Sequence, residues 1–219
     1  MRINRVILET KNIEALASFY STVLELPVIK KEGDFTVVVG NSTIQFQQAR
    51  ETQEPIYHFA LTIPSNKIED AREWLQQRVE LIWIEDYKSV VADFVHWNAK
   101  SVYFFDAAGN ILELIARIDL KNDRNEKFSS DQFLSVSEIG LVFTEEEIEI
   151  KTNELLTQFQ LSFFSRQPPS PNFKAIGNDE GLLIIVTENR NWYPTNKKSF
   201  ISPIQLEFEN FGKEYSVQF

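Results

Sequence analysis

The feature that most constrains the fold is a repeated order of segments: a strand, an amphipathic helix, then several short strands. This order begins at Arg2, starts again near Tyr57 and returns at Leu134. Alternating apolar residues predict the strands, and apolar residues at three-and-four spacing predict the helices. One such βαβββ module has an open, curved sheet with unpaired edges, which a second module can cover. We therefore expect an α+β protein in which repeated βαβββ modules pair into a cup-shaped mixed sheet, with a degenerate second half.

The copies are not equally complete, and this suggests a domain organisation. Residues 1–118 hold two βαβββ modules, which we expect to pair with each other into one cup-shaped domain. Residues 119–132 are charged and poor in apolar side chains, as in a linker. Residues 133–219 hold a degenerate third module and, from Ile204 to Phe208, the first strand of a partial fourth. Leftover sheet edges and the incomplete fourth module predict a homodimer.

Composition excludes several classes of partner. The formal net charge is -10, which repels phosphate backbones and anionic lipid, so we expect neither nucleic acid nor a membrane as a partner. The sequence has no cysteine, no N-terminal signal pattern and no apolar run approaching about 18 residues, which together predict a cytoplasmic protein. Eighteen Phe, six Tyr and four Trp stand against two His, so a cavity in this chain should have aromatic walls.

A hairpin with a carboxylate in it is the clearest functional signal. The stretch 101–117 reads SVYFFDAAGNILELIAR, in which two apolar runs flank a turn rich in Asp, Gly and Asn. Glu113 shares one face of the second run with Ile111 and Ile115, because side chains alternate along a strand. A buried carboxylate needs a cation, a metal or hydrogen-bond donors. We predict that Glu113 is the catalytic group; the alternative is an edge position with its head in water.

Two other segments could contribute to a cavity. His96 and Trp97, with Tyr103 in the following strand, could supply an acid/base group and an aromatic wall, although strand aromatics are commonly part of the core. The loop 189–194 could cover an opening, or could be a turn that packs Trp192.

Three stretches carry a family resemblance: VILETKNIEALASFYSTVLELPV, HFALTIPSNKIEDAREWL and SVYFFDAAGNILELIAR. They resemble the vicinal oxygen chelate superfamily, which includes glyoxalase I, extradiol dioxygenases and bleomycin resistance proteins. The last stretch is similar to the family's "YF.DP.GN..E" signature, with Ala107 in place of the usual proline. The resemblance implies a protein that binds a small molecule in a cup-shaped cavity, as a divalent-metal-dependent lyase, isomerase or dioxygenase. Alternatively, it implies a metal-free protein that sequesters a small ligand.

The resemblance also points to site residues, because metal ligands in this superfamily come from the first and last strands of paired modules. These positions are held here by Arg5, Gln45, His58 and Glu113. His58, Glu113 and Gln45 can bind a divalent ion, whereas Arg5 cannot and could instead extend into the cavity towards Glu113. The alternative for His58 is a histidine satisfied within the core.

The third module offers only part of a second ligand set. Glu138 holds its first-strand position, but Ile184 and Ile185 leave no ligand on its last strand, so we expect no second metal site.

Overall fold

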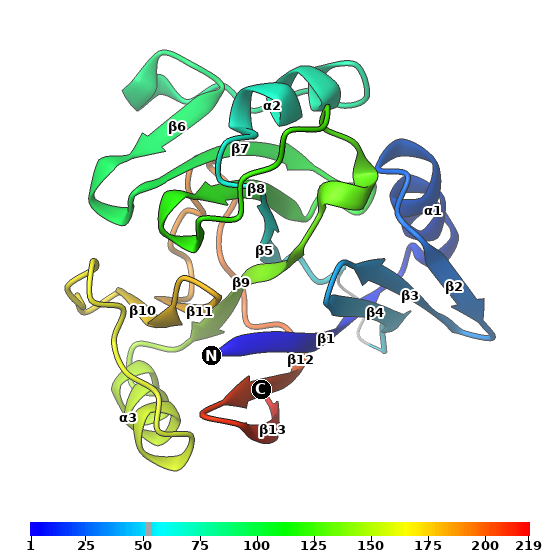
Figure 1. The fold of residues 1–219 in the computed structure, drawn as a ribbon. Helices are drawn as coiled ribbons and strands as arrows, with labels where there is room; N and C mark the ends of the chain where they lie inside the picture. Colours follow the sequence, from blue (N-terminus) through cyan, green and yellow to red (C-terminus); the bar gives the residue numbers. More distant parts are fainter. Residues whose placement is uncertain (51–53) are drawn as a thin grey trace.

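The computed structural model describes residues 1–50 and 54–219, which form a mixed α+β fold with three α-helices around a 13-stranded sheet (Figure 1). The helices are α1 (Ile13–Ser18), α2 (Ile68–Gln76) and α3 (Ile148–Gln158). The strands are β1 (Arg2–Thr10), β2 (Val28–Lys31), β3 (Asp34–Val39), β4 (Ser42–Gln48), β5 (His58–Ile63), β6 (Val91–Phe94), β7 (Ala99–Phe105), β8 (Ile111–Arg117), β9 (Ser135–Phe143), β10 (Phe173–Asn178), β11 (Gly181–Thr187), β12 (Ile204–Asn210) and β13 (Lys213–Gln218).

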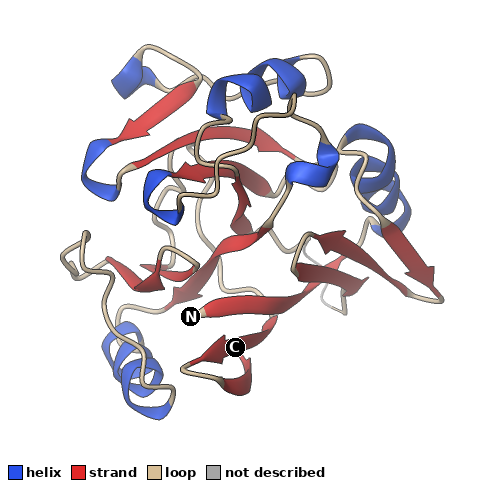
Figure 2. Cartoon of the chain, viewed as in Figure 1, coloured by secondary structure: helices blue, strands red, loops and turns tan. Residues whose placement is uncertain are grey.

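The predicted fold class is confirmed, since each helix follows the first strand of a module and lies at the outside of the sheet (Figure 2). The α2 helix buries Ile68, Ala71 and Leu75, which lie at three-and-four spacing, and turns its charged side chains to solvent. At the start of α3, the backbone N–H of Glu147 donates to the Thr144 hydroxyl, and the Glu147 carboxylate accepts from Thr144 in return. This reciprocal capping satisfies amide donors that the first turn of a helix leaves free.

The pairing of modules differs from the expected one. Strand β1 pairs antiparallel with β12, and β5 pairs antiparallel with β9, so the first module joins the fourth and the second joins the third. Our expectation that the two modules within residues 1–118 pair with each other was therefore wrong. The reason is physical: the first strand of every module presents an equivalent free edge, and the local pattern does not determine which edge it meets.

One sheet runs through both pairs of modules. Its central path has the order β2-β3-β4-β1-β9-β5-β8-β7-β6, and β1 and β9 meet where Ile3 pairs with Val136. Figure 1 shows the consequence: β1 and β12, from opposite ends of the chain, lie side by side near both termini, and β9 lies between β1 and β5. Whether residues 1–118 and 133–219 are separate folding domains joined by a 119–132 linker stays a prediction.

The hairpin between β7 and β8 is held by its turn residues. The Asp106 carboxylate accepts the backbone N–H groups of Ala108 and Asn110, and Gly109 has a φ of +84°, which favours glycine. Burial raises the pKa of Asp106 to about 6, and the Tyr20 hydroxyl donates to the same carboxylate at 2.9 Å. The side-chain oxygen of Asn110 accepts the backbone N–H of Tyr57 at 2.9 Å. These bonds fix the start of β5 beside β8.

Two apolar stretches of the second module do not form regular strands. Leu81 and Ile84 make only isolated bridges, and residues 95–97 form a turn of 3-10 helix instead of extending β6. The hairpin partner of β12, β13, was not anticipated. Among the described residues, the helices are too short or too polar to cross a membrane.

Candidate functional site

The centre of the sheet brings two carboxylates into one row. On β5, Ala60 pairs with Glu113 of β8 on one side and with Glu138 of β9 on the other. Three neighbouring strands therefore place Glu113, a methyl group and Glu138 side by side, about 4.8 Å apart from strand to strand. Both carboxylates are nearly fully buried, with 3% and 4% of their surface exposed. The expectation that Glu113 is buried is thereby met, and its edge alternative is excluded.

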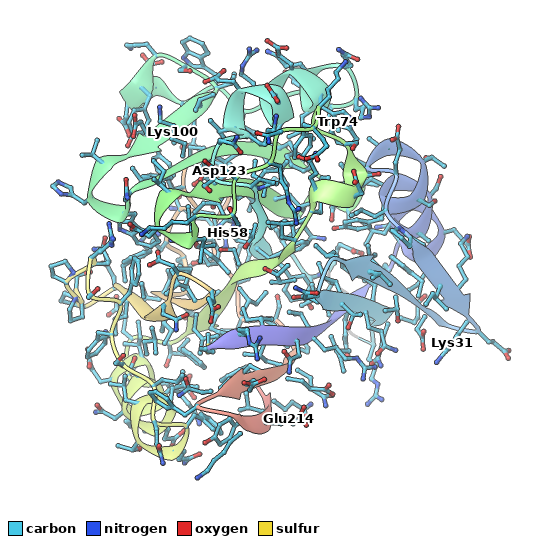
Figure 3. All side chains as sticks on the ribbon, in the orientation of Figure 1. Lys31, His58, Trp74, Lys100, Asp123 and Glu214 are labelled. Atoms are coloured by element: carbon cyan, nitrogen blue, oxygen red, sulfur yellow. The ribbon has the colours of Figure 1, made fainter. Side chains whose placement is uncertain are left out.

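His58 lies two residues before Ala60 and so shares this face of the sheet. Its Nδ1 lies 3.1 Å from the backbone carbonyl of Ile111, which can only accept a hydrogen bond, so Nδ1 carries the proton in the neutral ring. The Nε2 lone pair is then free and lies 3.7 Å from a Glu113 oxygen. Figure 3 places His58 in the interior of the molecule.

The ligand atoms of His58, Glu113 and Glu138 all lie within 4.8 Å of one another. We call this group the His–Glu–Glu cluster. Its members come from β5, β8 and β9, so the cluster exists only because the second module pairs with the third. Glu138, which belongs to a module without a ligand on its last strand, thus lies beside His58 and Glu113 of the second module, and the three together could hold a metal ion.

Arg117 supplies positive charge beside the cluster. It lies on β8 four residues after Glu113, is fully buried, and bonds through Nη2 to Glu138 and through Nε to the Ser137 hydroxyl at 3.2 Å. Its third partner is Asp179, at 3.4 Å from Nη1. The two buried carboxylates of the cluster therefore lie near a single buried guanidinium, that of Arg117.

Burial, with the charge imbalance as a smaller contribution, determines the protonation of the cluster. Burial, followed by repulsion from Glu138, raises the pKa of Glu113 to about 8, against the opposing effect of the Ser101 hydroxyl that donates to it. Burial also raises the pKa of Glu138, although Arg117 opposes the rise. Burial lowers the pKa of His58 to about 4. At neutral pH, His58 is neutral and Glu113 is largely protonated.

The cluster lies in the wall of a cavity of about 410 Å³. Phe, Tyr and Trp are the largest group among the cavity-lining residues, in agreement with the expectation from composition, and they are Phe94, Trp97, Tyr103, Phe173, Trp192 and Tyr193. A volume of this size suits a small organic molecule. Trp97 donates from its indole N–H to Gln167 at 3.0 Å, which fixes one wall.

The loop between β11 and β12 forms one side of the cavity and supplies Arg190, Trp192 and Tyr193 to its lining. The loop is tied at its base, because the backbone N–H of Arg190 donates to the Ser199 hydroxyl, which donates in turn to the carbonyl of Thr187. Trp192 is packed, with 3% of its surface exposed, as expected for a turn that packs this residue, and the loop also lines the cavity.

Comparisons with known proteins support the fold. No protein-family model and no curated protein matches the sequence. Among solved structures, a proposed dioxygenase of Bacillus subtilis subsp. subtilis strain 168 aligns with a TM-score of 0.59, at 18% identity over 85% of this chain and 63% of that chain. The chain has the vicinal oxygen chelate fold.

Two further solved structures match at lower scores. A glyoxalase/bleomycin resistance protein/dioxygenase from Nocardioides has a TM-score of 0.44 and 23% identity, covering 59% of this chain and 90% of that chain. A lactoylglutathione lyase from Agrobacterium tumefaciens has a TM-score of 0.42 and 16% identity, covering 51% and 90%. This chain spans 63% of the length of the Bacillus subtilis protein, and the likeness is one of fold.

The vicinal oxygen chelate fold does not unite all the residues that the resemblance pointed to. His58 and Glu113 meet in the cluster, but Arg5 and Gln45 lie on β1 and β4. There the Arg5 guanidinium donates to the Gln45 side chain and lies 3.5 Å from Glu207 of β12. Neither residue lines the cavity. The cation beside Glu113 is Arg117 and not Arg5.

Of the other residues that the sequence suggested for the cavity, two line it and one does not. Trp97 and Tyr103 line the cavity, and the Tyr103 ring lies 6.4 Å from the His58 ring. His96 is exposed and is not part of the cavity lining. Alternation along the strand puts Arg117 on the same face as Glu113, and this signal was available in the sequence. Arg190 had no comparable signal, because a loop residue has no periodicity.

Gly140 controls how closely Trp192 approaches the sheet. A Cβ on Gly140 would lie 2.5 Å from Cη2 of Trp192 and 3.2 Å from the carbonyl oxygen of His58. We expect Gly140→Ala to displace Trp192 and to lower the free energy of unfolding by about 1 to 3 kcal/mol. Chemical denaturation followed by tryptophan fluorescence measures this change. In a Trp192→Leu background the same glycine substitution should cost much less, and an equal cost in both backgrounds would show that the indole is not the obstacle.

Proposed function

We propose that this protein is a metal-dependent enzyme that binds a small molecule in the cavity beside a divalent ion held by His58, Glu113 and Glu138. The observation that carries the proposal is the His–Glu–Glu cluster, three buried ligand side chains within 4.8 Å of one another in the wall of a cavity. The proposed reaction class is a lyase, isomerase or dioxygenase reaction, as in the family that the sequence resembles. Gln45, an expected ligand, is replaced in this proposal by Glu138.

The residues present suit a divalent ion. The free Nε2 of His58 offers a lone pair, and the bond from Nδ1 to a backbone carbonyl fixes its orientation, an arrangement common among metal-binding histidines. Two carboxylates with one guanidinium leave an excess of negative charge once Glu113 ionises, and a divalent ion would offset it. One imidazole and two carboxylates form a donor set used by zinc and by other first-row metals.

The chain's own groups would position the bound molecule and exchange a proton with it. A bound divalent ion would supply Lewis-acid polarisation of an oxygen of the bound molecule. Tyr103 stays protonated, because burial raises the pKa of its phenol well above its usual value, so it can serve as a hydrogen-bond donor beside Glu113. The aromatic walls would shield one side of the bound molecule from water.

The alternative is a metal-free protein that sequesters a small molecule in the same cavity. One specific observation favours it: Arg117 already pairs with Glu138 and occupies part of its hydrogen-bonding capacity. In this alternative the guanidinium takes the place of the metal charge, as was first considered for Arg5.

Titration with divalent ions tests the proposal. We expect Mn²⁺, Fe²⁺ or Zn²⁺ to bind the wild type and raise its thermal midpoint, since a ligand that binds only the folded state stabilises it. His58→Ala and Glu138→Gln should each weaken binding by about 100-fold or more. Gln45→Ala is the matched control and should bind as the wild type does.

The outcomes separate the two candidates. Absence of binding, or equal binding by wild type and His58→Ala, would refute the metal site and favour the sequestering protein. Loss of binding in Gln45→Ala would instead restore the ligand set expected from the sequence. Homodimer formation and a cytoplasmic location remain predictions of the sequence.

A further inference from the structure

We propose that Arg190 binds a carboxylate of the ligand, so that the cavity selects aromatic or similarly flat carboxylates. This inference rests on the proposed function only in taking the cavity as the ligand site. It names a substrate class that neither the fold nor the His–Glu–Glu cluster specifies.

The first observation is the charge at the cavity wall. Among the described residues that line the cavity, Arg190 is the one arginine or lysine. Its side chain is half-buried, and the structure shows no carboxylate within ion-pairing distance of it in the described parts of the chain. Its guanidinium donates once, through Nη1 to the carbonyl of Asn191 at 3.2 Å. Since a guanidinium has five N–H donors, most of them remain free to bind a ligand.

The environment of Arg190 is unfavourable for a cation without a partner. Burial lowers its pKa, which means that the charged form has lost part of its hydration. The ring of Phe173 lies under the guanidinium, with 5.0 Å from Cζ to the ring centroid, and holds it in place. A planar carboxylate would meet the fork of the guanidinium with two parallel hydrogen bonds.

Trp192, two residues after Arg190, also lines the cavity, but its indole N–H is buried within the protein. The indole therefore contributes an apolar surface to the wall, and Arg190 is the group of this loop that can bind an anion.

The rest of the cavity suits a flat, apolar body. Aromatic rings from several strands and loops form its walls. The Phe94 ring packs against the Trp97 ring, and its centroid lies 6.0 Å from the centroid of the Tyr193 ring. The net charge of -10 does not prevent anion binding, because at physiological salt the protein's distant charges are screened beyond about 8 Å. In the cavity wall itself, Glu138 is paired with Arg117, and Glu113 accepts a hydrogen bond from Ser101. Arg190 has no such partner among the described residues, so we expect its charge to determine the preference.

Benzoate and benzamide test the proposal, because they have nearly the same shape and differ in charge. We expect the wild type to bind benzoate about tenfold more tightly than benzamide by calorimetry, and Arg190→Met to lose this preference. Arg190→Lys should keep only part of it, since a lysine keeps the charge but lacks the fork. Arg2→Met, which removes the same charge from an exposed side chain outside the cavity, is the control and should keep the full preference.

The metal titration separates this inference from the proposed function. Arg190→Met should still bind divalent ions, at least as tightly as the wild type, because Arg190 is outside the cluster and its positive charge repels a cation at His58. A preference for benzoate that depends on Arg190, in a protein that binds no metal, would support the present inference and refute the metal-dependent enzyme. Equal binding of the two compounds, no binding of either, or an unchanged preference in Arg190→Met would overturn the role of Arg190, whether or not a metal binds.

Discussion

Replacing Arg117 with methionine is expected to lower the free energy of unfolding by about 3 to 5 kcal/mol, because the change leaves Glu138 buried without its cation. The Arg117 side chain is fully buried, and its ion pair with Glu138 is almost as inaccessible to water. Its guanidinium also lies 5.6 Å from the Trp97 ring centroid and 5.7 Å from that of Phe164. Methionine keeps the apolar stem of the side chain, so the charge is the main loss. Urea denaturation at neutral pH measures the effect.

Arg5→Met is the matched control for this experiment. Arg5 pairs with Glu207 at 3.5 Å, but both side chains are more than a third exposed, so the pair should contribute less than about 1 kcal/mol. Adding Glu138→Gln to Arg117→Met should recover part of the loss, because it removes the uncompensated charge. If the Arg117 and Arg5 variants are equally stable, the buried pair does not stabilise this protein.

Arg117 also shows which part of the site the sequence could have revealed. Glu113, Ile115 and Arg117 alternate along β8, so the cation beside the carboxylate was visible as a neighbour on the same face. The resemblance instead directed attention to Arg5, on the assumption that β1 and β8 belong to one cup. Local periodicity was the better guide here, because it does not depend on which modules pair.

The fold itself was largely predictable, since strand alternation, helix spacing and the turn Asp106–Asn110 are local signals. The pairing of modules was not, because the edges of β1, β5 and β9 have similar sequences of apolar residues and their choice of partner depends on the whole assembly. That choice brings Glu138 to His58 and Glu113 and leaves Gln45 with Arg5. The expected ligand set of His58, Glu113 and Gln45 therefore shares only His58 and Glu113 with the cluster in the structure.

The second large effect is a pH dependence that Glu113 should give to stability. Its pKa is about 8 in the folded protein against an ordinary value of 4.5. At a pH between these two values, Glu113 is protonated in the folded state and ionised in the unfolded state. The free energy of unfolding therefore falls as the pH rises through this range. His58 acts in the opposite sense, because its pKa falls from 6.5 to about 4 and stability is lost as pH drops through that range. The two contributions nearly cancel below about pH 6.5.

We therefore expect the wild type to lose about 2 kcal/mol between about pH 6.5 and 8, where only Glu113 of this pair changes its protonation. Glu113→Gln removes the titrating group, so its free energy of unfolding should change little over the same window. Urea denaturation at a series of pH values gives both curves. A saturating divalent ion should flatten the wild-type curve, since the bound cation favours the ionised carboxylate. Identical curves for wild type and Glu113→Gln without metal would mean that Glu113 is already ionised at neutral pH, with Arg117 compensating both carboxylates.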